Sequence, residues 1–178
     1  RAYPRTFGYK WSIIIAIKRN SKPKYKSPKK NYLGCLKIEG MAAYTEIVSL
    51  PIEEVWKHLL HKIEHPEFFV PGVSDVVILE KTTAFTLRSM KLLGENGQAM
   101  TVFEKITAQP YLVRFTLVEH PVYKGYVDNL AEKVSARETR LTFAMHWTNL
   151  NTGENLENPE LLKRAVQKTI EYMRQTKR

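Results

Sequence analysis

Six consecutive β-prone segments joined by short turns occupy residues 73–148 of this 178-residue chain. Short links connect antiparallel neighbours, because a parallel connection needs a crossover of a dozen or more residues. The clearest turn is Asn96-Gly97, where both central residues must tolerate positive φ. The pattern therefore predicts one antiparallel sheet, with strands at 73–80, 84–92, 99–108, 111–119, 126–135 and 139–148.

Further elements flank this run on both sides. Residues 42–50 alternate loosely and predict a first strand, which brings the sheet to seven strands. A helix is expected at 51–64, where Pro51 suits the first turn, and a single helical turn at 67–70. The apolar stripe of the helix at 51–64 consists of Ile52, Val55, Trp56, Leu59, Leu60 and Ile63. A last helix is expected at 159–177, with Asn158 as its N-cap. The predicted class is α+β, with the helices covering one face of a curved sheet.

A known family shares several of these features. They are Leu50-Pro51 at the start of the first helix, the segment His65-Pro66-Glu67-Phe68-Phe69-Val70-Pro71-Gly72-Val73, the charged strand 102–107 and the Pro-initiated last helix. In these features residues 42–176 resemble the START/polyketide-cyclase-like (SRPBCC) superfamily, and most of all its AtaL-like family. The resemblance implies a helix-grip fold, in which a seven-stranded curved sheet wraps around a long C-terminal helix and encloses an apolar ligand cavity. It implies no particular reaction, because one fold hosts carriers and cyclases alike.

Two charged residues on neighbouring strands are the leading site candidates. Glu104 shares a strand face with Val102 and Ile106, so it points into the cavity if they do. A buried carboxylate needs a partner, and Arg88 on the adjacent strand is the natural one. The hypothesis is that this pair forms the polar floor of a pocket and orients a hydroxyl or carboxyl group. The alternative is an ion pair on the solvent face, which stabilises little.

The remaining ligand-binding candidates follow from strand and helix periodicity. They are Phe115, Tyr126, Asp128, Met145, Trp147, Val166 and Ile170. Met and aromatic side chains make adaptable apolar contacts with ligands, but ordinary core packing also explains such a stripe. His58, His61 and His65 share one side of the first helix and are expected to face solvent rather than a metal. No cofactor motif is found, and no cofactor or metal is expected.

Charge is distributed very unevenly along the chain. Residues 1–40 contain 11 of the 28 Lys and Arg residues and one acid, Glu39, so they carry the whole formal charge of +10. This stretch is expected to be a disordered extension, with a ligand-binding domain at 41–178. Nucleic acid is an unlikely partner and would bind through the extension only. The longest strongly apolar run, Trp11–Ile17, is too short to span a bilayer, and the single cysteine, Cys35, fits a cytoplasmic protein.

Three functions remain open at this stage. The first is binding of a small hydrophobic or aromatic molecule under the last helix. The second is a cyclase- or dehydratase-like enzyme acting on a polyketide-like substrate, with Glu104 as acid–base and Arg88 or Tyr126 as hydrogen-bond donor. The third is binding to nucleic acid or a membrane surface through the basic extension. Neither the ligand nor the oligomeric state follows from the sequence.

Overall fold

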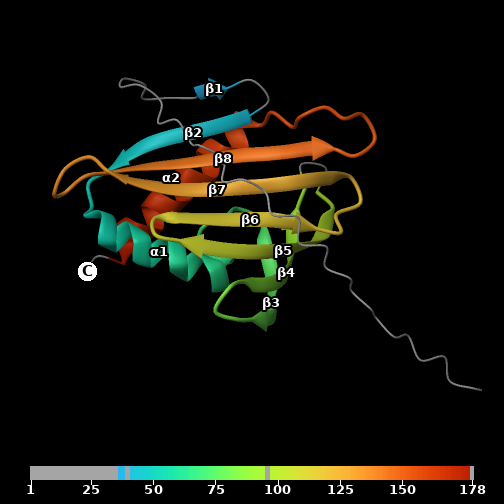
Figure 1. Cartoon of the computed structure of the whole chain (residues 1–178), viewed down its shortest axis with the longest axis horizontal. Helices are drawn as coiled ribbons and strands as arrows, with labels where there is room; N and C mark the ends of the chain where they lie inside the picture. The colour runs from blue at the N-terminus through green and yellow to red at the C-terminus, as the bar shows by residue number, and fades with distance from the viewer. Residues whose placement is uncertain (1–35, 39–40, 95–96, 177–178) are drawn as a thin grey trace, which may run out of the picture. The chain divides into compact units, whose positions relative to one another are not determined.

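The computed structural model describes residues 36–38, 41–94 and 97–176. One antiparallel sheet has the strand order β1-β2-β8-β7-β6-β5-β4-β3, and the helices lie behind it in Figure 1. The elements are β1 (Leu36–Ile38), β2 (Met41–Val48), α1 (Ile52–Glu64), the 3-10 turn η1 (Pro66–Phe68), β3 (Val73–Lys81), β4 (Thr86–Leu93), β5 (Ala99–Gln109), β6 (Leu112–Val118), β7 (Tyr123–Lys133), β8 (Thr139–Asn149) and α2 (Pro159–Gln175). None of the described helices is long and apolar enough to cross a membrane.

The predicted α+β class and the seven expected strands are confirmed. An eighth strand, β1, pairs with β2 and lies inside the segment expected to be an extension, so the ordered sheet starts before residue 41. Residues 95–96 of the expected Asn-Gly turn lie outside the described residues, although Gly97 has the positive φ that such a turn needs. The expectation that 1–40 is disordered concerns residues that are otherwise not described.

Helix α1 differs from its predicted stripe at one important position. Its buried residues are Ile52, Val55, Leu59 and Lys62, spaced three or four apart so that they share one face. Leu60, expected on that face, is 39% exposed. Lys62 therefore occupies a core position on this face, where the sequence analysis predicted only hydrophobic residues.

Helix α2 starts as predicted and lies against β2 and β8 (Figure 1). The side chain of Asn158 accepts a hydrogen bond from the Leu161 N–H at 3.0 Å, and Pro159 occupies the first turn. The buried face of α2 contains Leu162, Ala165, Val166, Thr169, Ile170 and Met173. These residues join Phe115, Phe143 and Met145 of the sheet in one hydrophobic core.

The open end of the β7–β8 hairpin, opposite its turn, requires a glycine. Gly125 has φ +128°, a region that side chains rarely adopt, and a Cβ there would lie 1.7 Å from the His146 carbonyl oxygen. The two backbones approach closely because no side chain separates them. This lets β7 begin at Tyr123, three residues before the predicted start.

Candidate functional site

The floor of the interior is a buried ion pair between β4 and β5. Arg88 and Glu104 are direct cross-strand partners, and they are 2% and 6% exposed. Arg88 Nε and Nη2 both donate to Glu104 Oε2, at 3.0 and 2.6 Å. The prediction that the pair faces inward is confirmed. Removing one partner of such a pair typically costs about 3–5 kcal/mol, because the other charge is left buried and unpaired.

Arg88 also holds the end of α1 against the sheet. Its Nη1 donates to the carbonyl oxygens of Lys62, at 2.9 Å, and Ile63, at 2.7 Å. These carbonyls belong to the last turn of α1, where the helix offers no N–H donors to them and the negative end of its dipole lies. The guanidinium therefore fixes the position of Lys62 as well as that of Glu104.

Lys62 extends from this last turn into the hydrophobic core. The residue is only 4% exposed, and its Nζ donates to Asn129 Oδ1 of β7 at 2.7 Å. The Nζ lies 3.9 Å from the centroid of the Phe143 ring and 5.6 Å from that of Phe115. Aromatic faces attract a cation but do not replace the water that an ammonium loses on burial.

The electrostatics of this group leave Lys62 poorly compensated. The pKa of Lys62 is lowered to about 7, mainly by burial and also by the nearby Arg88 cation, while Glu104 opposes the shift. Glu104 already neutralises Arg88, so the second cation has no carboxylate of its own. Near neutral pH, Lys62 therefore gives up its proton much more readily than an ordinary lysine.

Asn129 completes the polar group and leaves one donor unused. The residue is fully buried and pairs across the strands with Phe143. Its Oδ1 accepts from Lys62, but its Nδ2 has no hydrogen-bond partner among the described residues. A buried N–H without an acceptor is costly, and this donor is available to hydrogen-bond an acceptor.

The apolar candidates lie around this polar group. Phe115, Met145, Val166 and Ile170 are each less than 5% exposed and belong to the same core. Val127 of β7 pairs across the strands with Phe115 of β6 and with Met145 of β8, so all three share the inner face. Trp147, also expected on that face, packs against the core at the end of β8. Their role in ligand binding stays a prediction.

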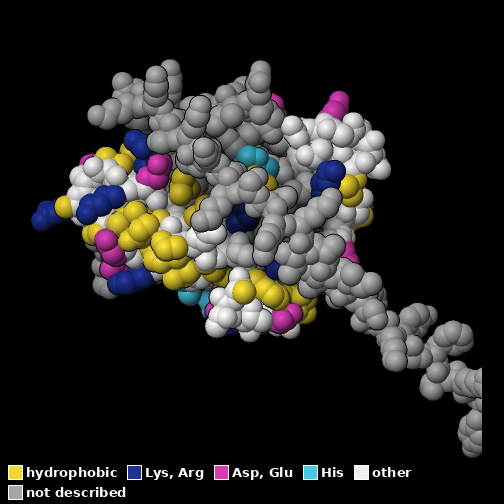
Figure 2. Space-filling model, viewed as in Figure 1, with side chains coloured by type: hydrophobic (Ala, Val, Ile, Leu, Met, Phe, Trp, Pro, Cys, Tyr) yellow, Lys and Arg dark blue, Asp and Glu magenta, His cyan; other side chains and the backbone are white. Residues whose placement is uncertain are grey.

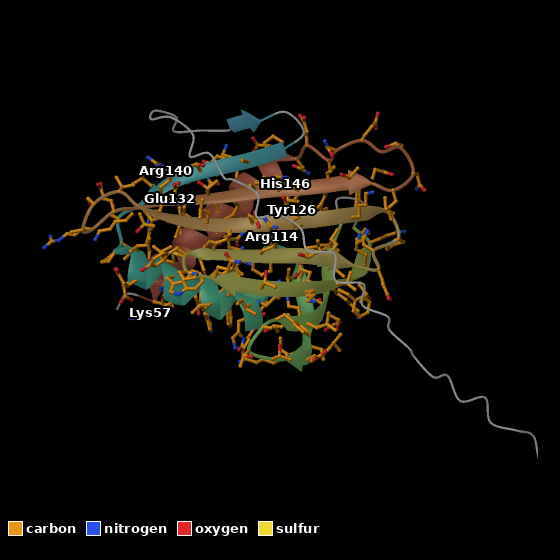
Figure 3. The ribbon with its side chains drawn as sticks, in the orientation of Figure 1. Lys57, Arg114, Tyr126, Glu132, Arg140 and His146 are labelled. Atoms are coloured by element: carbon orange, nitrogen blue, oxygen red, sulfur yellow. The ribbon has the colours of Figure 1, made fainter. Side chains whose placement is uncertain are left out.

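Tyr126 and Asp128 were expected to line the cavity, but they lie on the outer face. The face of β7 is decided by its partners: Val127 opposes Phe115 and Met145, whereas Tyr126 opposes His146. Figure 3 shows Tyr126 with Arg114 and His146 on the side away from the helices. The Arg114 guanidinium lies 3.8 Å from the Tyr126 ring centroid and donates to both carboxylate oxygens of Asp128 at 2.7 Å.

This outer face has mixed charge. Figure 2 shows acidic and basic side chains interspersed with hydrophobic ones where the surface is described. Arg140 and Glu132 form another pair there, 3.7 Å apart. The acidic alternation along 126–132 was the signal that this set of residues faces outward.

A surface groove also exists, away from the predicted site. Its volume is about 410 Å³, and it lies where the start of α1 meets the end of α2. The lining residues are Ser49, Leu50, Pro51, Glu54, His58, Arg137, Met173 and Thr176. None of the ligand-binding residues predicted from the sequence borders it.

The histidines of α1 contact aromatic rings. The His61 ring lies nearly parallel to that of Tyr172 in α2, with centroids 5.9 Å apart. His58 and His61 are half-buried and His65 is exposed, so the expected solvated face is found only in part. Within the described ranges, no three His, Cys, Asp or Glu residues are grouped so as to hold a metal ion.

Comparison with protein families gives a match over most of the domain. The family model described as "Acetylaranotin biosynthesis cluster protein L" (AtaL) matches residues 43–178. The chain belongs to the AtaL family. This confirms the family resemblance seen in the sequence. No functionally curated protein matches this AtaL-family chain.

Solved structures share the fold of this AtaL-family chain at low sequence identity. The Zhui aromatase/cyclase from Streptomyces sp. R1128 is 17% identical, with a TM-score of 0.56 over 75% of this chain and 86% of that one. A START superfamily protein from Mycobacterium smegmatis is 14% identical, with a TM-score of 0.53 over 76% and 92%. A conserved protein from Geobacillus kaustophilus is 11% identical, with a TM-score of 0.57 over 76% and 96%. At these identities the likeness shows the helix-grip fold alone.

Sequence reasoning missed Lys62 and Asn129. Lys62 follows Leu59 by three residues and Val55 by seven, so its position on the buried face was readable from helical spacing. Asn129 alternates with Val127 and Ala131, the inward set of β7. Both residues were passed over because polar side chains at such positions are more often exposed.

Proposed function

We propose that this protein binds a small, largely apolar molecule with one acidic oxygen, such as a phenol, an enol or a carboxylate, between the sheet and α2. The decisive observation is the charge of the interior. The three buried charged side chains of the described residues are Lys62, Arg88 and Glu104, which leaves one positive charge in excess. An anionic oxygen beside Lys62 supplies the missing partner, and Asn129 Nδ2 supplies a second donor to it.

The family and fold relationships support this kind of ligand. The family is described by a biosynthesis cluster, and one protein of similar fold is an aromatase/cyclase. Both descriptions agree with an oxygenated, ring-containing biosynthetic intermediate. The apolar shell of Phe115, Phe143 and Met145 suits its carbon skeleton.

A ligand reaches Lys62 only when a covering segment moves, because the amine is packed among side chains. Residues 65–72, which follow the end of α1, form the candidate cover. Phe69 in this segment is fully buried against Tyr172, with ring centroids 4.6 Å apart. Lys168 of α2 holds the segment through its Nζ, which donates to the carbonyl oxygens of Glu67, at 2.8 Å, and Val70, at 3.1 Å.

The test is titration of the full chain with 2-hydroxyanthraquinone, in which isothermal titration calorimetry measures the affinity. Lys62→Met keeps the length and apolar stem of the side chain but removes the amine, and we expect about tenfold or greater loss of affinity, as for a lost charge-assisted hydrogen bond. Lys57→Met is the matched control, because Lys57 lies on the exposed side of the same helix. Equal affinity of wild type and Lys62→Met rules out the proposed site. Loss on Arg137→Met instead assigns binding to the surface groove.

A second candidate, a cyclase-like enzyme, is favoured by the lowered pKa of Lys62. A group with a pKa of about 7 both accepts and donates a proton at neutral pH, as acid–base catalysis at a carbonyl requires. Glu104 suits this role less well than the sequence suggested, because two N–H groups of Arg88 hold its Oε2.

The enzyme candidate is tested by proton exchange at the carbon next to a carbonyl. We expect the wild type to accelerate deuterium uptake by 2-tetralone in D₂O, followed by NMR, and Lys62→Met to lose the acceleration. Glu104→Gln distinguishes the two possible acid–base groups. No acceleration by the wild type leaves binding as the function.

A further inference from the structure

A second set of unused donors lies on the inner face at the end of the β7–β8 hairpin. Trp147 packs against the core, and its Nε1 is buried without a hydrogen-bond partner among the described residues. An indole N–H can only donate, so it needs an acceptor. No acceptor for it is found in the described part of the chain, which is the same situation as at Asn129 Nδ2.

His120 lies beside this indole and is held in one tautomer. Its Nδ1 accepts hydrogen bonds from the backbone N–H groups of Val122, at 3.2 Å, and Tyr123, at 2.9 Å. The proton of the neutral ring must therefore be on Nε2. Burial lowers the pKa of His120, which agrees with a neutral ring. The His120 and Trp147 ring centroids are 6.2 Å apart, so the two rings that carry these N–H groups are neighbours.

Tyr123 completes an aromatic corner with His120 and Trp147 and shapes it for a flat group. Its ring lies 5.8 Å from that of Trp147, at an interplanar angle of 28°. The His120 ring contacts both of these rings, and its centroid lies 5.5 Å from that of Tyr123. His120 itself is 7% exposed, so the corner is largely shielded from water. Hydrogen bonds from such a site gain strength because water does not compete for them.

The two donor sites lie along the same strand at a fixed spacing. Phe143, which pairs with Asn129, and Trp147 are four residues apart on β8 and share its inner face. At about 3.3 Å per residue this separates them by roughly 13 Å. Met145 and Val127 form a cross-strand pair between them, so the residues between the two sites are apolar.

We propose that the ligand is elongated and carries acceptor oxygens at both ends, one bound by Lys62 and Asn129 and the other by Trp147 and His120. This inference rests on the proposed function and adds to it the length and polarity of the ligand. A linear system of several fused rings, or an extended chain of similar length, with oxygen at each end fits the spacing. A ligand with oxygen at one end leaves the Trp147 donor unpaired.

The test compares 2,6-dihydroxyanthraquinone, which has oxygens at both ends, with 2-hydroxyanthraquinone, which lacks one of them. We expect the full-length wild type to bind the two-ended probe about tenfold more tightly, as calorimetry would show. Trp147→Phe keeps the aromatic ring but removes the donor, and it should abolish the preference for the two-ended probe. Trp56→Phe, on α1, is the control for loss of an indole elsewhere.

A stability measurement separates loss of the donor from damage to the fold. Because the indole N–H is unpaired in the free protein, Trp147→Phe should leave the melting temperature unchanged or raise it. His120→Asn retains an acceptor for the loop N–H groups, removes the Nε2 donor and should weaken the preference as well. Equal affinity of the wild type for both probes overturns the two-ended site but leaves the Lys62 site standing. No binding of either probe overturns both proposals.

Discussion

At the scale of single residues, the interior depends on which charge lacks a partner. Arg88 and Glu104 neutralise each other and are tied to the end of α1. Lys62 has only an amide oxygen and two aromatic rings near its amine. The ion pair holds the end of α1 in place, and Lys62 is the buried charged group that has no carboxylate partner among the described residues.

This arrangement predicts an unusual dependence of stability on pH. The pKa of Lys62 is about 7 in the folded state, against 10.5 for an unperturbed lysine. Between these values the unfolded chain binds one more proton, so the free energy of unfolding should rise with pH, by up to about 1.4 kcal/mol per pH unit. Below pH 7 both states are protonated, the slope from this group vanishes and the full burial cost remains.

Urea unfolding at pH 7.5, 8.5 and 9.5 checks this prediction. The rise should be present in the wild type and in Lys57→Met, and absent in Lys62→Met. Lys62→Met should also be the more stable protein at pH 7, because it no longer buries a charge. The same slope in all three proteins would contradict the assignment of a low pKa to Lys62.

At the scale of elements, the molecule combines a rigid sheet with a small movable part. The strands β4 to β8 pair with their neighbours over five to eleven residues each. In contrast, η1 is a single helical turn, and Gly72 after it has φ +77°. The packing of Phe68 and Phe69 against Tyr172 and the two hydrogen bonds from Lys168 hold this segment to α2. The segment has no ladder of paired strands, so we expect it to open before the sheet does.

Lys168→Met should release this segment without unfolding the sheet. The loss of two hydrogen bonds donated by a charged group is expected to cost about 1–3 kcal/mol of local stability. Hydrogen exchange at residues 66–70 should accelerate, while exchange in β7 and β8 stays unchanged. The association rate of 2-hydroxyanthraquinone should rise if this segment is the cover. Lys163→Met, at a half-exposed position on α2, is the control. Unchanged exchange at 66–70 would mean that another element covers Lys62.

At the scale of the whole molecule, the basic charge and the binding domain are separate along the chain. Residues 1–40 carry the net charge of +10, and residues 43–178 match the AtaL family. Residues 31–178 form one unit, which is separate from the first unit, residues 1–30. The ligand site is therefore expected to work without the first unit.

Deletion of residues 1–30 tests this independence. We expect the melting temperature and the affinity for 2-hydroxyanthraquinone to be unchanged, because every residue of the proposed site lies in the second unit. Any binding of a DNA duplex should be strongly salt-dependent and should disappear on deletion. Loss of small-molecule binding in the deleted protein would place part of the site in the first unit.

The sequence by itself determined the order of elements and the α+β class, because periodicity and turn chemistry act over a few residues and are visible in one chain. The helix-grip fold was implied by the family resemblance, and the inward placement of Arg88 and Glu104 was one of two alternatives that only the structure decided. Tertiary structure decided which face of β7 is buried, because Tyr126 and Val127 belong to equally regular alternations and only the partners on β6 and β8 choose between them. It also decided that Lys62 and Asn129 meet, since residues 67 positions apart are brought together by the docking of α1 on the sheet. Local pattern fixes the elements, but the balance of buried charge exists only once these elements pack.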